Sequence, residues 1–132
     1  MASKILFVCV ENAGRSQMAE AFFKKYAPKK FQGISAGTNP TNELNPIVVQ
    51  AMKEVGINLS GKPKSISTKT IDDSFLTINM GCMDKNSCPA LFVKDISDWG
   101  IPDPKGKSLE DVRKIRDEIE TRVKNLVKSL EE

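Results

Sequence analysis

The sequence contains no histidine and only three cysteines among its 132 residues. Without histidine, no Cys–His pair can activate a thiol, and the commonest metal-binding side chain is missing. Cys82 and Cys88 alone would fill only half of a tetrahedral zinc site, so we expect no metal. A nucleophilic cysteine in this chain would therefore depend on backbone dipoles or on a permanent positive charge.

Long apolar runs are also missing. No segment approaches the length of a membrane span, and residues 1–4 lead directly into a short strand-like segment, so we expect neither a membrane anchor nor a signal peptide. We expect a cytoplasmic protein whose cysteines serve as thiols or in redox chemistry rather than in structural disulfides. The formal charge of +3 is too small to indicate nucleic-acid binding, although the many lysines modestly favour an anionic substrate.

The order of the expected elements indicates the fold class. Apolar runs predict strands, while three- and four-residue spacing with capping residues predicts helices. The expected strands are 4–10, 31–36, 75–80 and 91–93, and the expected helices are 15–26, 45–56, a short turn near 70–73 and a long helix from 108. Strands that alternate with helices favour right-handed crossovers. We predict an α/β fold: a single three-layer domain over residues 1–132, with a mostly parallel four-stranded sheet and helices on both faces.

The most informative segment follows the first expected strand and reads Cys9-Val10-Glu11-Asn12-Ala13-Gly14-Arg15-Ser16. A strand ending at Cys9 and a helix beginning near Arg15 force the backbone between them to curl, so that its N–H groups and the helix N-terminus can cradle an oxyanion. Arg15 adds a planar, permanently charged fork for two oxygens. This positive field would lower the pKa of Cys9 and favour the thiolate. The alternative is that Cys9 is a small core residue at the end of an apolar strand.

Further motifs extend this pattern along the chain. They are Ser16-Gln17-Met18-Ala19-Glu20-Ala21, Ser35-Ala36-Gly37-Thr38, Met80-Gly81-Cys82, Cys88-Pro89, Asp98-Trp99 and Asp103-Pro104-Lys105-Gly106-Lys107. With them, nearly the whole chain resembles the low-molecular-weight protein tyrosine phosphatase superfamily, and within it the thioredoxin-coupled arsenate reductases. The resemblance implies a low-molecular-weight phosphatase-like fold and a thiol-dependent arsenate reductase.

The resemblance also implies catalytic roles for five residues. Cys9 thiolate would attack arsenate held by Arg15 and the loop amides, while Asp103 protonates the departing hydroxide. Cys82 would release arsenite by forming a disulfide with Cys9, and Cys88 would carry that disulfide outward as Cys82–Cys88. Thioredoxin or an equivalent dithiol protein would then reduce the pair, so no bound cofactor is expected, and the protein is expected to be a monomer.

Two other functions remain open at this stage. A phosphatase would use Cys9, Arg15 and Asp103 through a phosphocysteine, and a binding or redox-sensing module would use the loop without turnover. Lys105 and Gly106 follow Asp103-Pro104 where phosphatases of this fold usually place aromatic residues, which favours the reductase. Cys82 and Cys88 could also be incidental thiols, and their spacing is one residue shorter than in many reductases of this kind.

Several neighbours of the nucleophile have expected supporting roles. We predict that Ser16 hydrogen-bonds the Cys9 sulfur and that Asn12 braces the loop through its side-chain amide. Gly14 stands where many relatives have an additional cysteine. Asn12, Glu20 and Ser35 match a cation site of some relatives, but Ser65 replaces their aspartate. Asp98 is an alternative acid to Asp103, and Trp99 is expected to anchor the core rather than to bind substrate.

Overall fold

The structure is a computed structural model, and it describes residues 3–80 and 96–131. Its strands are β1 (Ser3–Cys9), β2 (Phe31–Gly37), β3 (Leu76–Asn79) and β4 (Ile96–Asp98), and its helices are α1 (Arg15–Tyr26), α2 (Pro46–Lys53), α3 (Thr68–Asp72) and α4 (Leu109–Glu131). The strands form one four-stranded sheet in the order β2-β1-β3-β4, and every neighbouring pair is parallel. The predicted α/β class with a parallel sheet is therefore confirmed.

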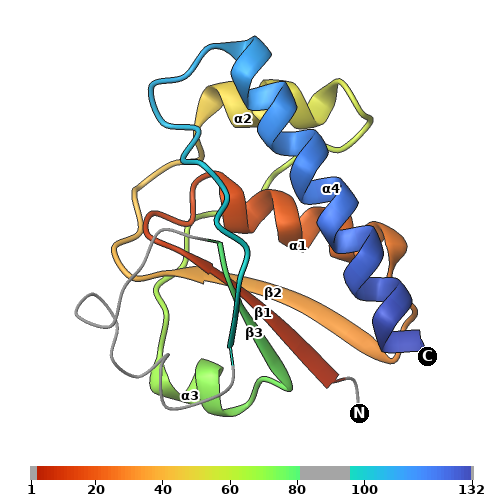
Figure 1. The fold of residues 1–132 in the computed structure, drawn as a ribbon. Coiled ribbons are helices and arrows are strands. Elements are labelled where there is room, and N and C mark those ends of the chain that lie inside the picture. Colours follow the sequence, from red (N-terminus) through yellow and green to blue (C-terminus); the bar gives the residue numbers. More distant parts are fainter. Residues whose placement is uncertain (1–2, 81–95, 132) are drawn as a thin grey trace.

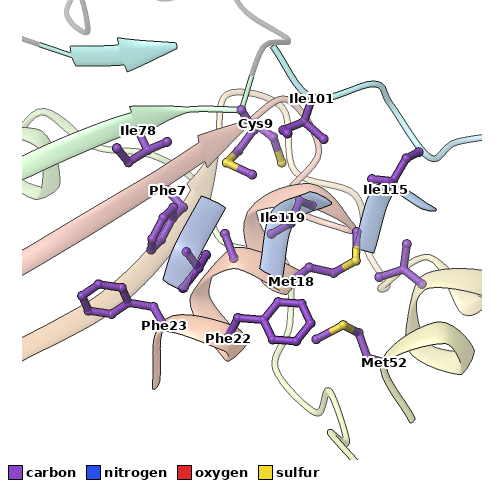
Figure 2. Packing of buried hydrophobic residues seen from close by; sticks show 14 of the residues in the cluster. Phe7, Cys9, Met18, Phe22, Phe23, Met52, Ile78, Ile101, Ile115 and Ile119 are labelled. Carbon is purple, nitrogen blue, oxygen red and sulfur yellow. The ribbon is translucent and has the colours of Figure 1, made fainter. Parts of the chain in front are cut away.

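Both faces of the central strand β1 are buried, which explains its unbroken apolar sequence. On one face, Ile5 and Phe7 belong to a large core cluster with α1 and α4, and Figure 2 shows Phe7 above Phe22 and Phe23 and beside a segment of α4. On the other face, Leu6 and Val8 pack with Ile71 of the short helix α3. Figure 1 shows α1, α2 and α4 together on one side of the sheet and α3 on the opposite side.

Most predicted elements lie where the sequence placed them. Helix α1 has the predicted bounds, and Asn45 caps α2 by accepting a hydrogen bond from the Ile47 amide at 3.0 Å. The strand predicted at 91–93 lies outside the described residues. The structure instead has β4 at Ile96–Asp98, and this three-residue strand is too short for an alternation pattern to reveal. Within the described residues, no helix is long and apolar enough to cross a membrane.

This topology places Cys9 at the edge of the sheet where a ligand can bind. Strand β1 lies between β2 and β3, so Cys9 ends at the middle of the carboxyl edge of the sheet. Helix α1 begins only six positions later, on the face that α4 also covers. In open α/β sheets, this carboxyl edge is where ligands bind.

A polar contact fastens α1 to α4 at the far end from this edge. The Tyr26 hydroxyl donates a hydrogen bond to the Glu120 carboxylate. That hydrogen bond, together with partial desolvation and the carboxylate charge, raises the pKa of Tyr26 from 10.0 to about 12. Because the neutral phenol is the donor, the contact requires protonated Tyr26.

We predict that Tyr26→Phe lowers the free energy of unfolding by about 1 kcal/mol near neutral pH, the usual value of one hydrogen bond. A folded-state pKa above the unfolded value adds stability that is complete below pH 10 and disappears as the pH rises through 12. The difference between wild type and Tyr26→Phe should therefore shrink over that interval in urea unfolding curves. A difference that stays constant from pH 8 to pH 12 would contradict the assigned contact.

Candidate active site

The Cys9 sulfur sits in a closely hydrogen-bonded environment. It lies 2.8 Å from Ser16 Oγ, and it accepts a hydrogen bond from the Asn12 backbone N–H at 3.2 Å. The residue is only 3% exposed. The predicted contact between Ser16 and the sulfur is confirmed. A Cys9 thiolate would accept hydrogen bonds from both the Asn12 N–H and the Ser16 hydroxyl, which favours it over a neutral thiol.

Five carbonyl groups of the loop are held outward, away from the pocket. They accept hydrogen bonds as follows: Cys9 O from Thr38 N at 3.2 Å, Val10 O from Asn39 N at 2.8 Å, Glu11 O from Thr41 N at 3.2 Å, Ala13 O from Asn45 N at 2.9 Å, and Gly14 O from Met18 N at 2.9 Å. Four of these donors belong to residues 38–45, which we call the outer belt.

The outward carbonyls determine where the loop amides point. In a trans peptide unit, the next residue's N–H is directed opposite to the carbonyl. The N–H groups of residues 10, 11, 12, 14 and 15 therefore point to the inside of the loop, and the bond from Asn12 N to the Cys9 sulfur is one observed case. The first turn of α1 adds further N–H groups without helical partners. Together they form a cradle for an anion next to the sulfur.

Asn12 braces this loop from its centre, as predicted. Its backbone has a φ of 53°, in the left-handed region that asparagine tolerates better than most residues. Its Nδ2 donates to Ser16 Oγ at 2.7 Å. Its Oδ1 accepts from Gln17 Nε2 at 3.0 Å and from the Lys64 backbone N–H at 2.8 Å. The fully buried side chain thus joins the loop, the helix and a distant segment.

Arg15 lies at the start of α1 with its guanidinium turned to the segment before α4. Its Nη1 donates to the Ile101 carbonyl at 2.7 Å, and its Nη2 lies 3.8 Å from Asp103 Oδ2. The Arg15 side chain is 6% exposed, whereas the Asp103 side chain is 56% exposed. A buried guanidinium, which carries a permanent positive charge, and an accessible carboxylate therefore lie side by side.

The segment that carries Asp103 is packed against the loop. A Cβ at Gly14 would lie 2.9 Å from Pro104 Cγ, so the absence of a side chain permits this close approach. On the rim, Lys105 Nζ lies 3.3 Å from Glu11 Oε2, and the Lys105 N–H donates to Asp103 Oδ1 at 3.0 Å. We call residues 9–15 the anion loop and residues 101–107 the acid segment. The two are therefore in direct contact.

The pocket that contains Cys9 lies between these two segments. It is lined by Cys9, Val10, Glu11, Ala13, Gly14, Arg15, Asn45, Asp103, Pro104 and Lys105. The structure thus brings Cys9, Arg15 and Asp103 together. Cys82 and Cys88 lie outside the described residues. Trp99 packs against Phe7 with ring centroids 5.8 Å apart, as expected of a core residue.

Three contributors to this site are not predicted from the sequence. The outer belt acts through backbone donors, which carry no residue-type signal. Asn45 caps α2, and it also lines the pocket and donates its N–H to the loop. Lys64 acts on the Asn12 side chain through its backbone N–H.

Known proteins match this chain over nearly its full length. Arsenate reductase 2 from Staphylococcus haemolyticus is 37% identical over 124 residues, which cover 92% of this chain and 93% of the relative. The YwlE arginine phosphatase from Geobacillus stearothermophilus superposes with a TM-score of 0.87 and 27% identity, over 98% of this chain and 93% of that one. A thioredoxin-dependent arsenate reductase from Corynebacterium glutamicum gives a TM-score of 0.82 and 36% identity, over 98% of this chain and 62% of that one.

The family comparison agrees with these relatives. The family described as low molecular weight phosphotyrosine protein phosphatase matches residues 4–132, which include the anion loop, the acid segment and α4. The cradle at Cys9 and the parallel sheet that carries it are therefore those of a known fold. The chain belongs to the low molecular weight phosphotyrosine protein phosphatase family.

Proposed function

We propose that this protein is an arsenate reductase that uses Cys9 as its nucleophile. The observation that carries the proposal is the cradle of inward N–H groups beside the hydrogen-bonded Cys9 sulfur. Arsenate is a tetrahedral oxyanion with the shape and charge of phosphate, so its oxygens match donors that converge on one point. The similarity to reductases at 36–37% identity supports the choice of arsenate.

The first step forms an arsenic–sulfur bond. Cys9 thiolate attacks the As(V) centre, while the loop amides and Arg15 hold the remaining oxygens. One oxygen leaves, and Asp103 is the group placed to protonate it, because its carboxylate lies beside Arg15 at the pocket opening. Arsenic is still As(V) in this Cys9 adduct, so no electron has yet been transferred.

Electron transfer belongs to the second step. Cys82 thiolate attacks the Cys9 sulfur, an S–S bond forms, the S–As bond breaks, and its electron pair stays on arsenic, which leaves as arsenite. Cys88 then attacks Cys82, which restores the Cys9 thiolate and leaves a Cys82–Cys88 disulfide. Since both residues follow β3, whose carboxyl end is beside that of β1, they can reach the same edge of the sheet.

The cycle closes with an external dithiol. A thioredoxin-like protein would reduce the Cys82–Cys88 disulfide by the same exchange chemistry, and its own two thiols supply the two electrons. The likeness to a thioredoxin-dependent reductase supports this partner. A reducing compartment such as the cytoplasm would keep all three thiols ready for the next turn.

The second candidate function is phosphomonoester or phosphoramidate hydrolysis. Cys9, Arg15 and Asp103 would suffice for a phosphocysteine intermediate that water resolves, with no need of a second thiol. The favouring observation is the TM-score of 0.87 with an arginine phosphatase. Both functions begin with attack of the Cys9 thiolate on the central atom of a tetrahedral oxyanion. They differ in the leaving group and in the second step, because Cys82 attacks the sulfur of the arsenic adduct whereas water attacks the phosphorus of a phosphocysteine.

Replacing the two distal cysteines one at a time separates the functions. Cys82→Ser should abolish arsenite release with thioredoxin, thioredoxin reductase and NADPH, while hydrolysis of p-nitrophenyl phosphate persists. Cys88→Ser should release one arsenite per enzyme and then stop with a Cys9–Cys82 disulfide, detectable by peptide mass spectrometry. Continued arsenate turnover in either variant would rule out the relay.

Removing the hydroxyl beside the sulfur tests how Cys9 is activated. Ser16→Ala should raise the pKa of Cys9 by about one unit, because a hydrogen bond to a charged group is lost. The pH dependence of Cys9 alkylation by iodoacetamide measures this pKa without substrate. Ser129→Ala, on the exposed end of α4, is the control and should leave the profile unchanged. An unshifted profile in Ser16→Ala would remove Ser16 from the activation of the thiol.

Replacing Asp103 with an uncharged residue should slow the chemical step without weakening anion binding. Asp103→Asn should lower kcat about 10²- to 10⁴-fold, the usual contribution of a general acid. Binding of phosphate as a competitive inhibitor should not weaken, because a negative charge next to Arg15 has been removed. Parallel measurement of kcat and of the phosphate inhibition constant checks both parts. Equal losses in the two would indicate a structural role for Asp103 instead.

A further inference from the structure

A second polar cluster lies behind the anion loop, outside the pocket. It joins Glu20 of α1, Ser35 of β2 and Lys64 of the loop that follows α2. Ser35 Oγ donates to Glu20 Oε1 at 2.8 Å, and Lys64 Nζ lies 3.3 Å from Ser35 Oγ and 3.6 Å from Glu20 Oε1. The Glu20 side chain is only 14% exposed, and its carboxylate has hydrogen-bonding and ion-pair partners in this cluster.

Lys64 connects this cluster to the anion loop. Its ammonium lies at Glu20 and Ser35, while its own backbone N–H donates to Asn12 Oδ1 at 2.8 Å. The adjoining backbone is fixed to the sheet, because Gly37 N donates to Lys64 O at 2.8 Å. One residue therefore holds the cluster with its side chain and Asn12 with its main chain.

The contact with Lys64 decides which way the Asn12 amide faces. Since Oδ1 accepts from Lys64 N and from Gln17 Nε2, Nδ2 must face Ser16 Oγ, to which it donates at 2.7 Å. Ser16 Oγ thus already accepts one hydrogen bond, and its own proton is available for donation to a Cys9 thiolate, whose sulfur is 2.8 Å away. A reversed Asn12 amide would instead accept the Ser16 proton and withdraw it from the sulfur.

We propose that Lys64 is a positioning residue that fixes the orientation of the Asn12 amide and so directs the Ser16 hydroxyl to the Cys9 thiolate. The inference rests on the proposed function only in taking Cys9 as the nucleophile. Lys64 reaches neither the pocket nor the sulfur, and it acts entirely through Asn12 and Ser16. Its charge holds its backbone in place by pairing with the largely buried Glu20.

The chain offers a matched control for this charge. Lys24 also pairs with Glu20, at 3.0 Å from Oε2, but its side chain is 61% exposed and it lies one helical turn along the same helix. Within the part of the chain that the structure describes, Lys24 forms no hydrogen bond or ion pair with Ser35 or Asn12, whereas Lys64 reaches both. Lys64→Met and Lys24→Met therefore remove the same charge from the same carboxylate, and only the first loosens the Asn12 amide.

The test measures the pH midpoint of Cys9 alkylation by iodoacetamide, followed at the Cys9 peptide by mass spectrometry. Lys64→Met should raise the midpoint by about one unit, the effect of weakening one hydrogen bond to a charged sulfur. Lys24→Met should not move it, and Lys64→Arg, which keeps the charge, should stay near wild type. Far-UV circular dichroism and thermal unfolding establish that each variant is folded.

Three results would overturn the proposal. They are an unshifted midpoint in Lys64→Met, an equal shift in Lys24→Met, and a shift in Lys64→Arg as large as that in Lys64→Met. Because alkylation needs no substrate, these outcomes are independent of arsenate turnover. Failure of arsenate reduction with the expected midpoints would reject the proposed activity and leave the role of Lys64 intact.

Discussion

The outward direction of the loop carbonyls is the constraint on which this site depends. A peptide unit cannot turn its carbonyl and the following N–H to the same side, so the cradle exists only while the carbonyls have partners elsewhere. The outer belt supplies most of those partners, and the first turn of α1 supplies another. Gly37 permits the required approach, since a Cβ there would lie 2.5 Å from the Val10 carbonyl oxygen. The oxyanion donors are thus held in place by hydrogen bonds on the outer side of the loop.

Preorganisation of this kind explains how a chain without histidine can support thiolate chemistry. The donors to the Cys9 sulfur come from the loop amide of Asn12 and from Ser16, and a buried Arg15 supplies the permanent charge. None of these groups has to lose or gain a proton to do so. The stabilising field is therefore built into the fold and does not depend on a titrating base.

The local parts of the structure were predictable from the sequence, and the long-range parts were not. Helix α1 and the N-cap at Asn45 carry residue-type signals within a few positions of each other. The pairing of the Cys9 sulfur with Ser16 and the bracing by Asn12 were likewise predictable, because these residues share one short loop. The bond from Lys64 to Asn12 spans 52 positions and uses a backbone donor, for which any residue type would serve. The same applies to the outer belt, while β4 is too short to have a periodicity.

The contact between Gly14 and Pro104 has a consequence for how such sites diversify. Because a Cβ at residue 14 would lie 2.9 Å from the proline ring, a larger residue there would have to push the acid segment outward and carry Asp103 with it. The two segments are about 90 positions apart in the chain, yet substitutions in one are acceptable only if the other makes room. Relatives with a side chain at the position of Gly14 must therefore have a differently placed acid segment. The anion loop and the acid segment are expected to co-evolve as a single unit.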